Sequence, residues 1–220
     1  MRVRRFVAAL FASAFLVPVA VAAPATAASP PAHTHAATCS AGYFDQDARL
    51  GPARLPDRGR VGHQLIGYRR TGGLGDRAFL ARYYDAAANS GQGGWIYPPA
   101  NGYVTRPDGT PVEWHQALRP GQDIDRYGSE YGSFLAPEGL PYAERSIPPQ
   151  SLDGTPAAGC NYHDYRVLKA FSVDAGPIAP WFGQPGRGRQ YQLDASLLRG
   201  APTQLTVGWL VANGYLRRLV

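Results

Sequence analysis

Residues 97–127, YPPANGYVTRPDGTPVEWHQALRPGQDIDRY, interleave turn-forming residues with β-prone tyrosine, valine and tryptophan. The turn signals are Pro98-Pro99, Asn101-Gly102, Pro107-Asp108-Gly109 and Pro120-Gly121. Turn signals spaced about eight to twelve residues apart are typical of short antiparallel strands joined by tight connections. The pattern, continued along the chain, predicts strands at Gly102–Arg106, Val112–Trp114, Asp123–Tyr127, Tyr162–Ala170 and Gln190–Leu193.

Helical patterns flank this β-rich region on both sides. Gly75-Asp76 is a helix start, apolar residues follow on one face, and Asn89-Ser90-Gly91 is a stop, so we expect a helix over 76–88. Residues 205–211, LTVGWLV, predict a second short helix, followed by a strand at Tyr215–Leu219. The fold class is therefore α+β, with a small curved antiparallel β core, an N-terminal helical subregion and a short C-terminal helix.

The N-terminus has the three parts of a secretory signal peptide. Three arginines lie in the first five residues, the apolar run Phe6–Val21 follows, and the small residues Ala25-Thr26-Ala27 end it. We expect cleavage after residue 27 and a secreted, extracellular protein. A membrane anchor is the alternative, but Pro18 interrupts the run, which is shorter than the ~20 apolar residues of a span. We therefore expect no stable membrane insertion after cleavage.

The rest of the chain divides by composition. Residues 28–38 are rich in alanine and proline, without an apolar period, and are expected to form a disordered leader. Residues 39–96 are expected to form a wrapping and helical subregion, and residues 97–220 the β-rich domain. The formal charge of +6 includes the signal-peptide arginines, so it is too small to indicate nucleic-acid binding.

The chain has two cysteines, Cys39 and Cys160. An even number in an exported protein favours pairing, so we expect a Cys39–Cys160 disulfide. The alternative is a nucleophilic thiol, which needs a low-pKa setting and a base, and the nearby His163 alone does not establish one. No ligand spacing typical of a metal site is present, and we expect no metal.

Two stretches are dense in glycine, proline and aromatic residues: DRYGSEYGSFLAP at 125–137 and PWFGQPGRGRQY at 180–191. Arg126 can clamp a phosphate with its planar fork, and Gln190 can donate and accept hydrogen bonds at once. Residue type alone leaves other roles open, because Arg126 could pair with Asp123 or Asp125 and a strand glutamine could face solvent.

Taken together and in this order, the two stretches resemble the NAD glycohydrolase domain of the tuberculosis necrotizing toxin family, which includes fungal surface NADases. The resemblance covers Tyr97–Leu219. It implies that 97–220 is an enzyme domain that cleaves the nicotinamide–ribose bond of NAD or NADP with water, without a cofactor. It also implies a substrate NAD(P) and, as a possible partner, an immunity protein.

Position by position, the resemblance places the catalytic residues on Arg126 and Gln190. The family aromatic that is tyrosine in the toxin falls on Phe134, which leaves ring stacking but no hydroxyl. Further substrate-binding candidates are aromatic walls, glycines that allow close backbone approach, and a second arginine: Tyr127, Trp181, Phe182, Gly186, Gly188 and Arg145. Trp181 and Phe182 could equally belong to the core.

Other functions remain to be weighed. A secreted, non-catalytic binding module could use the same arginine and aromatic residues. An ADP-ribosyltransferase would place a Glu/Gln-x-Glu pair late in the chain, but no glutamate follows Glu144. A glycoside hydrolase would need two opposed carboxylates, for which Asp123, Asp125, Glu130, Glu138 and Glu144 are candidates. A serine hydrolase is not indicated, because no G-x-S-x-G motif occurs.

Overall fold

The computed structural model describes residues 38–219. The predicted signal peptide (1–27) and, apart from Thr38, the predicted leader (28–38) lie outside the described residues. Within 38–219, none of the helices combines the length and the apolar character that a membrane crossing requires.

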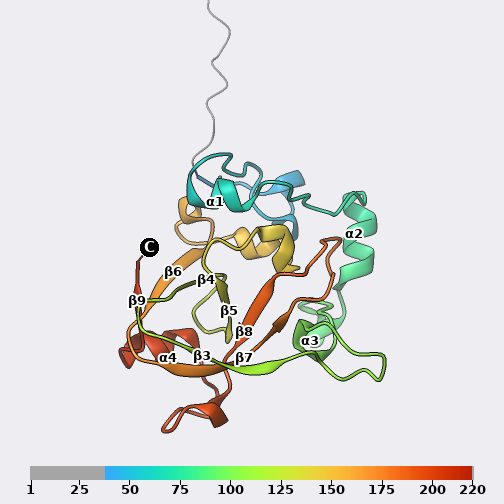
Figure 1. Cartoon of the computed structure of the whole chain (residues 1–220). Coiled ribbons are helices and arrows are strands. Elements are labelled where there is room, and N and C mark those ends of the chain that lie inside the picture. The colour runs from blue at the N-terminus through green and yellow to red at the C-terminus, as the bar shows by residue number, and fades with distance from the viewer. Residues whose placement is uncertain (1–37, 220) are drawn as a thin grey trace, which may run out of the picture. The chain divides into compact units, whose positions relative to one another are not determined.

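A seven-stranded antiparallel sheet organises the molecule, in the order β3-β7-β8-β5-β4-β6-β9. Figure 1 shows that this sheet is strongly curved. The strands are β3 (Trp114–Leu118), β4 (Asp123–Tyr127), β5 (Phe134–Pro137), β6 (Tyr162–Val167), β7 (Phe171–Pro177), β8 (Arg189–Gln192) and β9 (Leu216–Arg218). The prediction of a small curved antiparallel core is confirmed.

The helices are short and lie mostly before the sheet in the chain. They are α1 (Gly59–Gln64), α2 (Asp76–Tyr83), α3 (Ala88–Gly91) and α4 (Val207–Ala212). A two-stranded ribbon joins β1 (Tyr84–Asp85) to β2 (Gly94–Trp95). Single 3-10 turns, including η3 (Ala100–Gly102), η4 (Tyr142–Arg145) and η5 (Pro149–Leu152), shape the connections. In Figure 1, α1 and α2 lie on the side of the sheet away from α4.

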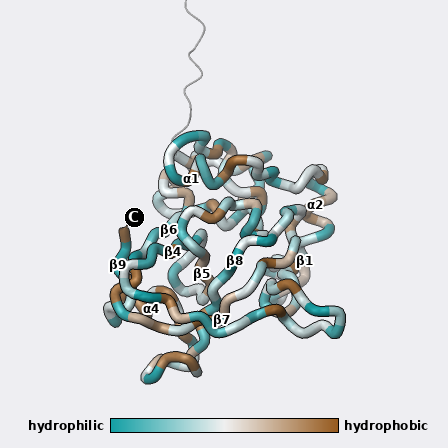
Figure 2. Tube along the Cα trace, viewed as in Figure 1, coloured by the Kyte–Doolittle hydropathy of each residue, from teal (hydrophilic) through white to brown (hydrophobic). Residues whose placement is uncertain are grey.

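Alternation along the strands gives the sheet two different faces. Ile124, Leu135 and Tyr191 point into the main hydrophobic core, which α4 completes with Val207 and Leu210. Their strand neighbours point the other way, because successive side chains of a strand alternate between faces. Figure 2 shows the resulting interleaving of hydrophobic and hydrophilic residues along the chain. The second face is therefore free to carry polar groups.

Two smaller cores join the N-terminal subregion to this second face. One holds Cys39, Cys160 and Tyr142, and the other holds Phe79 and Phe182. The predicted disulfide is confirmed: Cys39 and Cys160 are bonded, with Cα atoms 5.2 Å apart and a sequence separation of 121. The described residues on both sides of the predicted boundary at 97 belong to one compact unit.

Several predicted elements have different bounds in the structure. The helix predicted at 76–88 starts at Asp76 but ends at Tyr83, because Tyr84 is extended and pairs with Trp95. The strand predicted at 102–106 is wrong: this segment makes only isolated bridges with Pro111 and Ile178. Prolines 107 and 111 lack the N–H donors that a continued ladder needs.

Other differences concern length and number. The strand predicted at 112–114 is β3, which begins at Trp114 and continues to Leu118 in register with β7. The strand predicted at 162–170 ends at Val167, and residues 168–170 turn into β7, which was not predicted. Strand β4 was predicted with its exact bounds, and β8, α4 and β9 lie within two residues of the predicted limits.

Candidate active site

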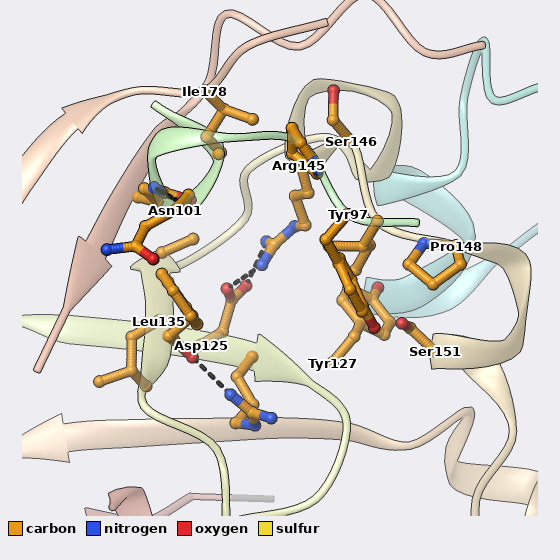
Figure 3. A pocket seen from close by; sticks show the side chains of 17 residues that line it. Tyr97, Asn101, Asp125, Tyr127, Leu135, Arg145, Ser146, Pro148, Ser151 and Ile178 are labelled. Atoms are coloured by element: carbon orange, nitrogen blue, oxygen red, sulfur yellow. Dashed lines mark hydrogen bonds and ion pairs between the residues drawn. The ribbon is translucent and has the colours of Figure 1, made fainter. Parts of the chain in front are cut away.

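A cavity of about 420 Å³ opens beside strands β4, β5 and β8 (Figure 3). This volume is within the range of small-molecule sites. In the view of Figure 3, Asn101, Leu135 and Ile178 lie on one side, Tyr97, Tyr127 and Pro148 on the other, and Asp125 and Arg145 between them. The lining residues are Tyr97, Pro98, Asn101, Gly102, Asp125, Arg126, Tyr127, Phe134, Leu135, Ala136, Arg145, Ser146, Ile147, Pro148, Ser151, Ile178 and Gln190.

Arg126, on β4, is a half-buried cation at this cavity. Its Nε donates to the Gly128 carbonyl at 3.1 Å and its Nη1 donates to the Phe134 carbonyl at 2.6 Å. Burial lowers the pKa of Arg126, but an arginine stays charged at neutral pH. Two neutral carbonyls therefore hold the guanidinium in place, and Glu130 acts on it electrostatically without forming an ion pair.

The carboxylates that could have neutralised Arg126 are paired elsewhere. Asp123 accepts from Arg166 at 2.8 and 2.7 Å, and Asp125 accepts from Arg145 at 2.6 and 2.9 Å. Within residues 38–219, Arg126 itself forms no ion pair. The alternative in which Arg126 pairs with Asp123 or Asp125 is wrong, and the cation is available for an anionic ligand.

The glycine-rich loop after β4 wraps around this guanidinium. A Cβ on Gly132 would lie 2.2 Å from Nη2 of Arg126, so a side chain there would displace the guanidinium. Helix α4 and strand β9 hold the loop in place. Val207 N–H donates to the Gly132 carbonyl at 3.1 Å, and Arg218 Nε donates to the Glu130 carboxylate at 2.7 Å. The density of glycine in the stretch 125–137 thus has a local cause.

Gln190 lies on β8, on the other side of β5 from Arg126. Its side chain is not on a solvated face: the residue is only 9% exposed, and its Nε2 donates to the Asn101 carbonyl at 2.9 Å. Phe134, on the intervening strand, is 37% exposed and lines the same cavity. Neighbouring strands thus place Arg126, Phe134 and Gln190 around one space.

Arg145 lines the cavity, but its guanidinium is already satisfied by protein groups. The residue is 6% exposed and forms a bidentate pair with Asp125, whose exposure is 0%. It also donates to the Leu140 carbonyl at 3.0 and 2.8 Å and to Gln64 Oε1 at 3.1 Å. These bonds hold β4 and η4 together at the cavity, and the substrate-binding role of Arg145 stays a prediction.

Tyr127 lines the cavity, but most of its contacts are with the protein interior. Its ring lines the cavity but is only 6% exposed, and it packs edge-on against Tyr142 at 4.9 Å. Its hydroxyl donates to Gln64 Oε1 at 3.1 Å, and burial raises the pKa of Tyr127 above its ordinary value. The phenol is therefore fixed and neutral, and only part of one wall is available for stacking.

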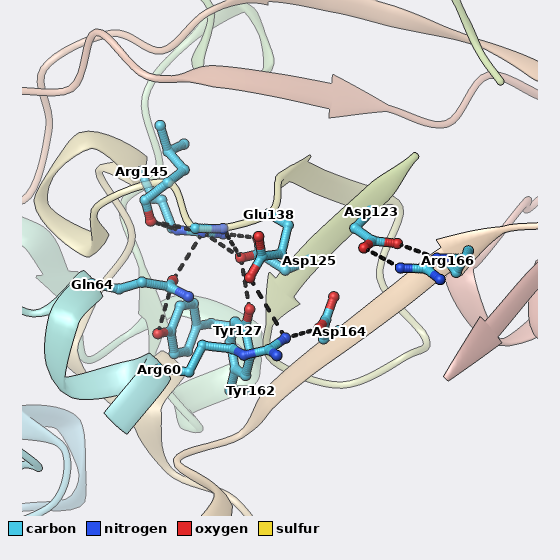
Figure 4. A network of polar contacts seen from close by, with 12 residues as sticks. Arg60, Gln64, Asp123, Asp125, Tyr127, Glu138, Arg145, Tyr162, Asp164 and Arg166 are labelled. Carbon is cyan, nitrogen blue, oxygen red and sulfur yellow. Dashed lines mark hydrogen bonds and ion pairs between the residues drawn. The ribbon is translucent and has the colours of Figure 1, made fainter. Parts of the chain in front are cut away.

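Helix α1 completes this buried polar network (Figure 4). It supplies Gln64 to Tyr127 and Arg145, and Arg60 to the buried carboxylate of Asp164 and to Glu138. Burial raises the pKa of Asp164, and Arg60 opposes this shift. The N-terminal subregion thus supports the strand that carries Arg126.

Four predicted substrate-binding residues do not line the cavity. Phe182 is fully buried among Tyr83, Trp95 and Tyr97, and Trp181 packs on Tyr83 and donates to the Ile96 carbonyl. A Cβ on Gly186 would lie 2.7 Å from the backbone of Ala179, and one on Gly188 would lie 2.7 Å from Leu140. In the structure these residues pack behind the walls of the cavity.

Three residues that line the cavity were not predicted as site residues: Tyr97, Asn101 and Gly102. Tyr97 is 62% exposed and its ring contacts Phe182 at 5.7 Å, so the buried phenylalanine orients the exposed tyrosine. Asn101 and Gly102 also line the cavity, although their sequence pattern indicated only a turn. The signal available in the sequence was the turn dipeptide Asn101-Gly102, which lies close to the exposed aromatic residue Tyr97 and before a strand.

The cavity contains no pair of opposed carboxylates. Asp125 is the only carboxylate among the lining residues, and Arg145 binds both of its oxygens. Two-carboxylate glycosidase chemistry therefore has no candidate pair at this cavity. The residues present define a site for an anionic small molecule that carries a flat ring: one arginine held by neutral carbonyls, one fixed amide and exposed aromatic rings.

Comparison with known proteins agrees with this class. The family model described as tuberculosis necrotizing toxin matches residues 117–219. The conidial surface nicotinamide adenine dinucleotide glycohydrolase nadA of Aspergillus fumigatus is 43% identical over 178 residues, which cover 80% of this chain and 71% of the relative. The chain belongs to the tuberculosis necrotizing toxin family, together with this fungal glycohydrolase.

Solved structures give weaker similarities. The tuberculosis necrotizing toxin complexed with its immunity factor aligns with 80% of this chain and 79% of its own, with 23% identity and a TM-score of 0.43. Tse6 in complex with Tsi6 aligns with 49% of this chain and 72% of its own, with 15% identity and a TM-score of 0.29. Neither alignment bears on the site.

Proposed function

We propose that the protein is an NAD glycohydrolase, which splits NAD and water into nicotinamide, ADP-ribose and a proton. The observation that carries this proposal is that Arg126 and Gln190, far apart in the sequence, line one cavity on either side of β5. These are the two positions that the family resemblance singles out. The 43% identity to a glycohydrolase named for this substrate supports the same activity.

The chemistry suits a site without a free carboxylate. The bond between ribose C1′ and the pyridinium nitrogen breaks, and its electron pair neutralises the nitrogen. Nicotinamide therefore leaves as a neutral molecule and needs no general acid. The ribose becomes an oxocarbenium-like centre, water adds at C1′, and the proton of that water passes to solvent. The site must hold the charged dinucleotide, shelter the cationic centre and place one water molecule.

In this proposal Arg126 binds the pyrophosphate. Its guanidinium is rigid and partly desolvated, and both properties strengthen a charge-assisted hydrogen bond. Phe134, exposed on the strand between the two catalytic positions, offers a face on which a heteroaromatic ring can stack. The arginine therefore fixes the central pyrophosphate of the substrate, and the ring walls restrict a ring at one of its ends.

Gln190 is proposed to act at the reacting ribose. Because its Nε2 donates to the Asn101 carbonyl, the amide orientation is set, and in this proposal Oε1 serves as the acceptor. An acceptor at that place can orient the attacking water or a ribose hydroxyl. It also favours the positive charge that develops at C1′, which is the kind of preorganised electrostatic contact that lowers a barrier.

The proposal extends to the conditions of action. NAD or NADP is the substrate, and the reaction as written uses no cofactor or metal. We propose that the protein acts outside the cytoplasm, because the Cys39–Cys160 disulfide suits an oxidising compartment and the fungal relative is named as a surface protein. Residues 97–220 are proposed as the enzyme domain and 39–96 as its support. An immunity protein remains a prediction of the resemblance.

Two other functions give different outcomes in a direct assay. A non-catalytic binding module would bind NAD without turnover, and an ADP-ribosyltransferase would leave ADP-ribose attached to a protein. Free ADP-ribose, released in step with nicotinamide, separates hydrolysis from both. The arginine at the cavity is compatible with all three, so the product decides.

The test of the site uses Arg126→Ala and Gln190→Ala. We expect each to lower the rate of NAD cleavage at least about a hundredfold, the usual cost of removing a positioned polar group, while circular dichroism shows an unchanged fold. Arg166→Ala is a matched control, because its guanidinium pairs with Asp123 outside the cavity lining. Full activity in both site variants would overturn the assignment of these residues.

A further inference from the structure

The wall of the cavity next to Gln190 is a left-handed turn. Ala100, Asn101 and Gly102 have φ angles of +51°, +52° and +82° in succession. Glycine adopts this region freely and asparagine tolerates it, but alanine does so at a cost. A run of three such residues persists only where its surroundings hold it, and strained backbone of this kind is concentrated at ligand sites.

The surroundings do hold it. Within the turn, Gly102 N–H donates to the Pro99 carbonyl at 3.0 Å and Tyr103 N–H donates to the Ala100 carbonyl at 3.0 Å. From the connection between β7 and β8, Ala179 N–H donates to the Gly102 carbonyl at 2.8 Å. The turn is therefore locked to the segment that leads into Gln190.

The turn gives Asn101 two separate connections to the site. Its backbone carbonyl accepts from Gln190 Nε2 at 2.9 Å, which orients that amide. Its side chain is exposed and lines the cavity, across from Tyr97 and Tyr127 in Figure 3. Within the described part of the chain, the Asn101 carboxamide forms no hydrogen bond, so both its donor and its acceptor are available.

Three other polar side chains of the cavity are more committed. Ser146 Oγ accepts from Trp181 N–H at 3.2 Å, and Arg145 is held by Asp125. Gln190 Nε2 is used by Asn101. Of the two side-chain amides that line the cavity, Gln190 uses one of its N–H donors on the Asn101 carbonyl, whereas the Asn101 carboxamide keeps all its donors and its acceptor unused.

The order of the chemical groups along NAD indicates that the nicotinamide lies beside Asn101. Arg126 and Gln190 lie on opposite sides of β5, and Asn101 touches Gln190. If Arg126 binds the pyrophosphate, the ribose lies next along the molecule, toward Gln190, and the nicotinamide lies beyond it. The group that reaches Asn101 is then the carboxamide of the leaving group.

We propose that the Asn101 carboxamide recognises the carboxamide of the nicotinamide by a pair of complementary hydrogen bonds, an inference that rests on the proposed function. Each amide donates one N–H and accepts at one oxygen. A nicotinic acid ring, with a carboxylate in place of the carboxamide, would lose one bond and set its negative oxygen against that of Asn101. Leaving a polar group unpaired in a site discriminates strongly between such analogues.

The test compares NAD with nicotinic acid adenine dinucleotide for the wild-type protein and for Asn101→Gly. Glycine keeps the left-handed backbone and the carbonyl that orients Gln190, so only the side chain is lost. We expect the wild type to prefer NAD in kcat/KM, and Asn101→Gly to reduce this preference at least about fivefold. Asn89→Gly is the matched control, because Asn89 also has a positive φ, +51°, and lies outside the cavity lining.

The outcomes separate this inference from the proposed function. If Asn101→Gly leaves the preference unchanged, or lowers kcat/KM for both dinucleotides equally, recognition of the carboxamide by Asn101 is overturned while NAD hydrolysis stands. If the wild type cleaves neither dinucleotide, both fail. Thermal unfolding of each variant, compared with Asn89→Gly, checks that a changed preference is not a loss of fold.

Discussion

Replacing Arg145 with methionine tests whether this arginine supports the fold or binds substrate. Asp125 has no exposed surface and receives two of its hydrogen bonds from Arg145, at 2.6 and 2.9 Å. The bonds from Tyr162 Oη and Gly139 N–H, both at 3.0 Å, would remain but carry no full charge. Removing one partner of a buried ion pair costs about 3–5 kcal/mol, so we expect a loss of that size in the free energy of unfolding.

Urea denaturation followed by tryptophan fluorescence and circular dichroism measures this loss as a lower midpoint at an unchanged slope. The double variant Arg145→Met, Asp125→Asn is the control, because it removes both charges and leaves no uncompensated carboxylate. We expect it to be more stable than Arg145→Met alone. A loss below about 1 kcal/mol, combined with a raised KM for NAD, would refute the structural role and return Arg145 to substrate binding.

Three further perturbations have definite expected results. Gly132→Ala should lower the rate of NAD turnover strongly and the free energy of unfolding little, because its Cβ would lie 2.2 Å from the Arg126 guanidinium. Gly42→Ala is the control for both measurements, because a Cβ there would have no atom within 4 Å. Replacing Cys39 and Cys160 with serine opens a loop with a sequence separation of 121 and should cost at most about 5 kcal/mol in the entropy model, read from denaturation. Burial raises the pKa of Asp153 to about 6. Between about pH 4 and 6 the folded state therefore binds more protons than the unfolded state. The free energy of unfolding then falls as the pH rises through that window. Asp153→Asn should remove this component, and equal slopes of stability against pH in variant and parent would contradict it.

The sheet was predictable where turn residues and alternation agree. Strand β4 was predicted with its exact bounds because Pro120-Gly121 precedes it and Gly128 follows it. Strand β7 was missed, although Phe171, Val173 and Ala175 alternate inward. The turn that separates it from β6 contains Leu168, Lys169 and Ala170, which are not turn-forming residues, so the predicted strand ran through the turn to Ala170 and the start of β7 was not recognised.

Site residues could be predicted from the sequence only where the residue type suits a single kind of environment. The cavity contains Arg126, Phe134 and Gln190, as the resemblance led us to expect. Trp181 and Phe182 were assigned to the walls because an aromatic residue suits a core as well as a binding site, and only the three-dimensional packing separates the two. The structural role of Arg145 could not be predicted, because its partner, Asp125, lies on another element that local sequence does not connect to it.

The N-terminal subregion could not be connected to the site from sequence at all. Arg60 and Gln64 belong to a short polar helix, and nothing near them indicates that they reach β4 and β6. Their partners are set by how the chain wraps, which depends on the disulfide and on two small cores that combine residues distant in sequence. Such long-range polar contacts need the fold before they can be identified.

The most direct test of NAD hydrolysis is the stoichiometry of products after incubation of the purified protein with NAD. We expect chromatography to find nicotinamide and free ADP-ribose in equal amounts, with no ADP-ribose attached to protein. We expect Gln190→Ala to form both products at least about a hundredfold more slowly. Intact NAD after incubation with the folded wild-type protein, or ADP-ribose found only on protein, would contradict it.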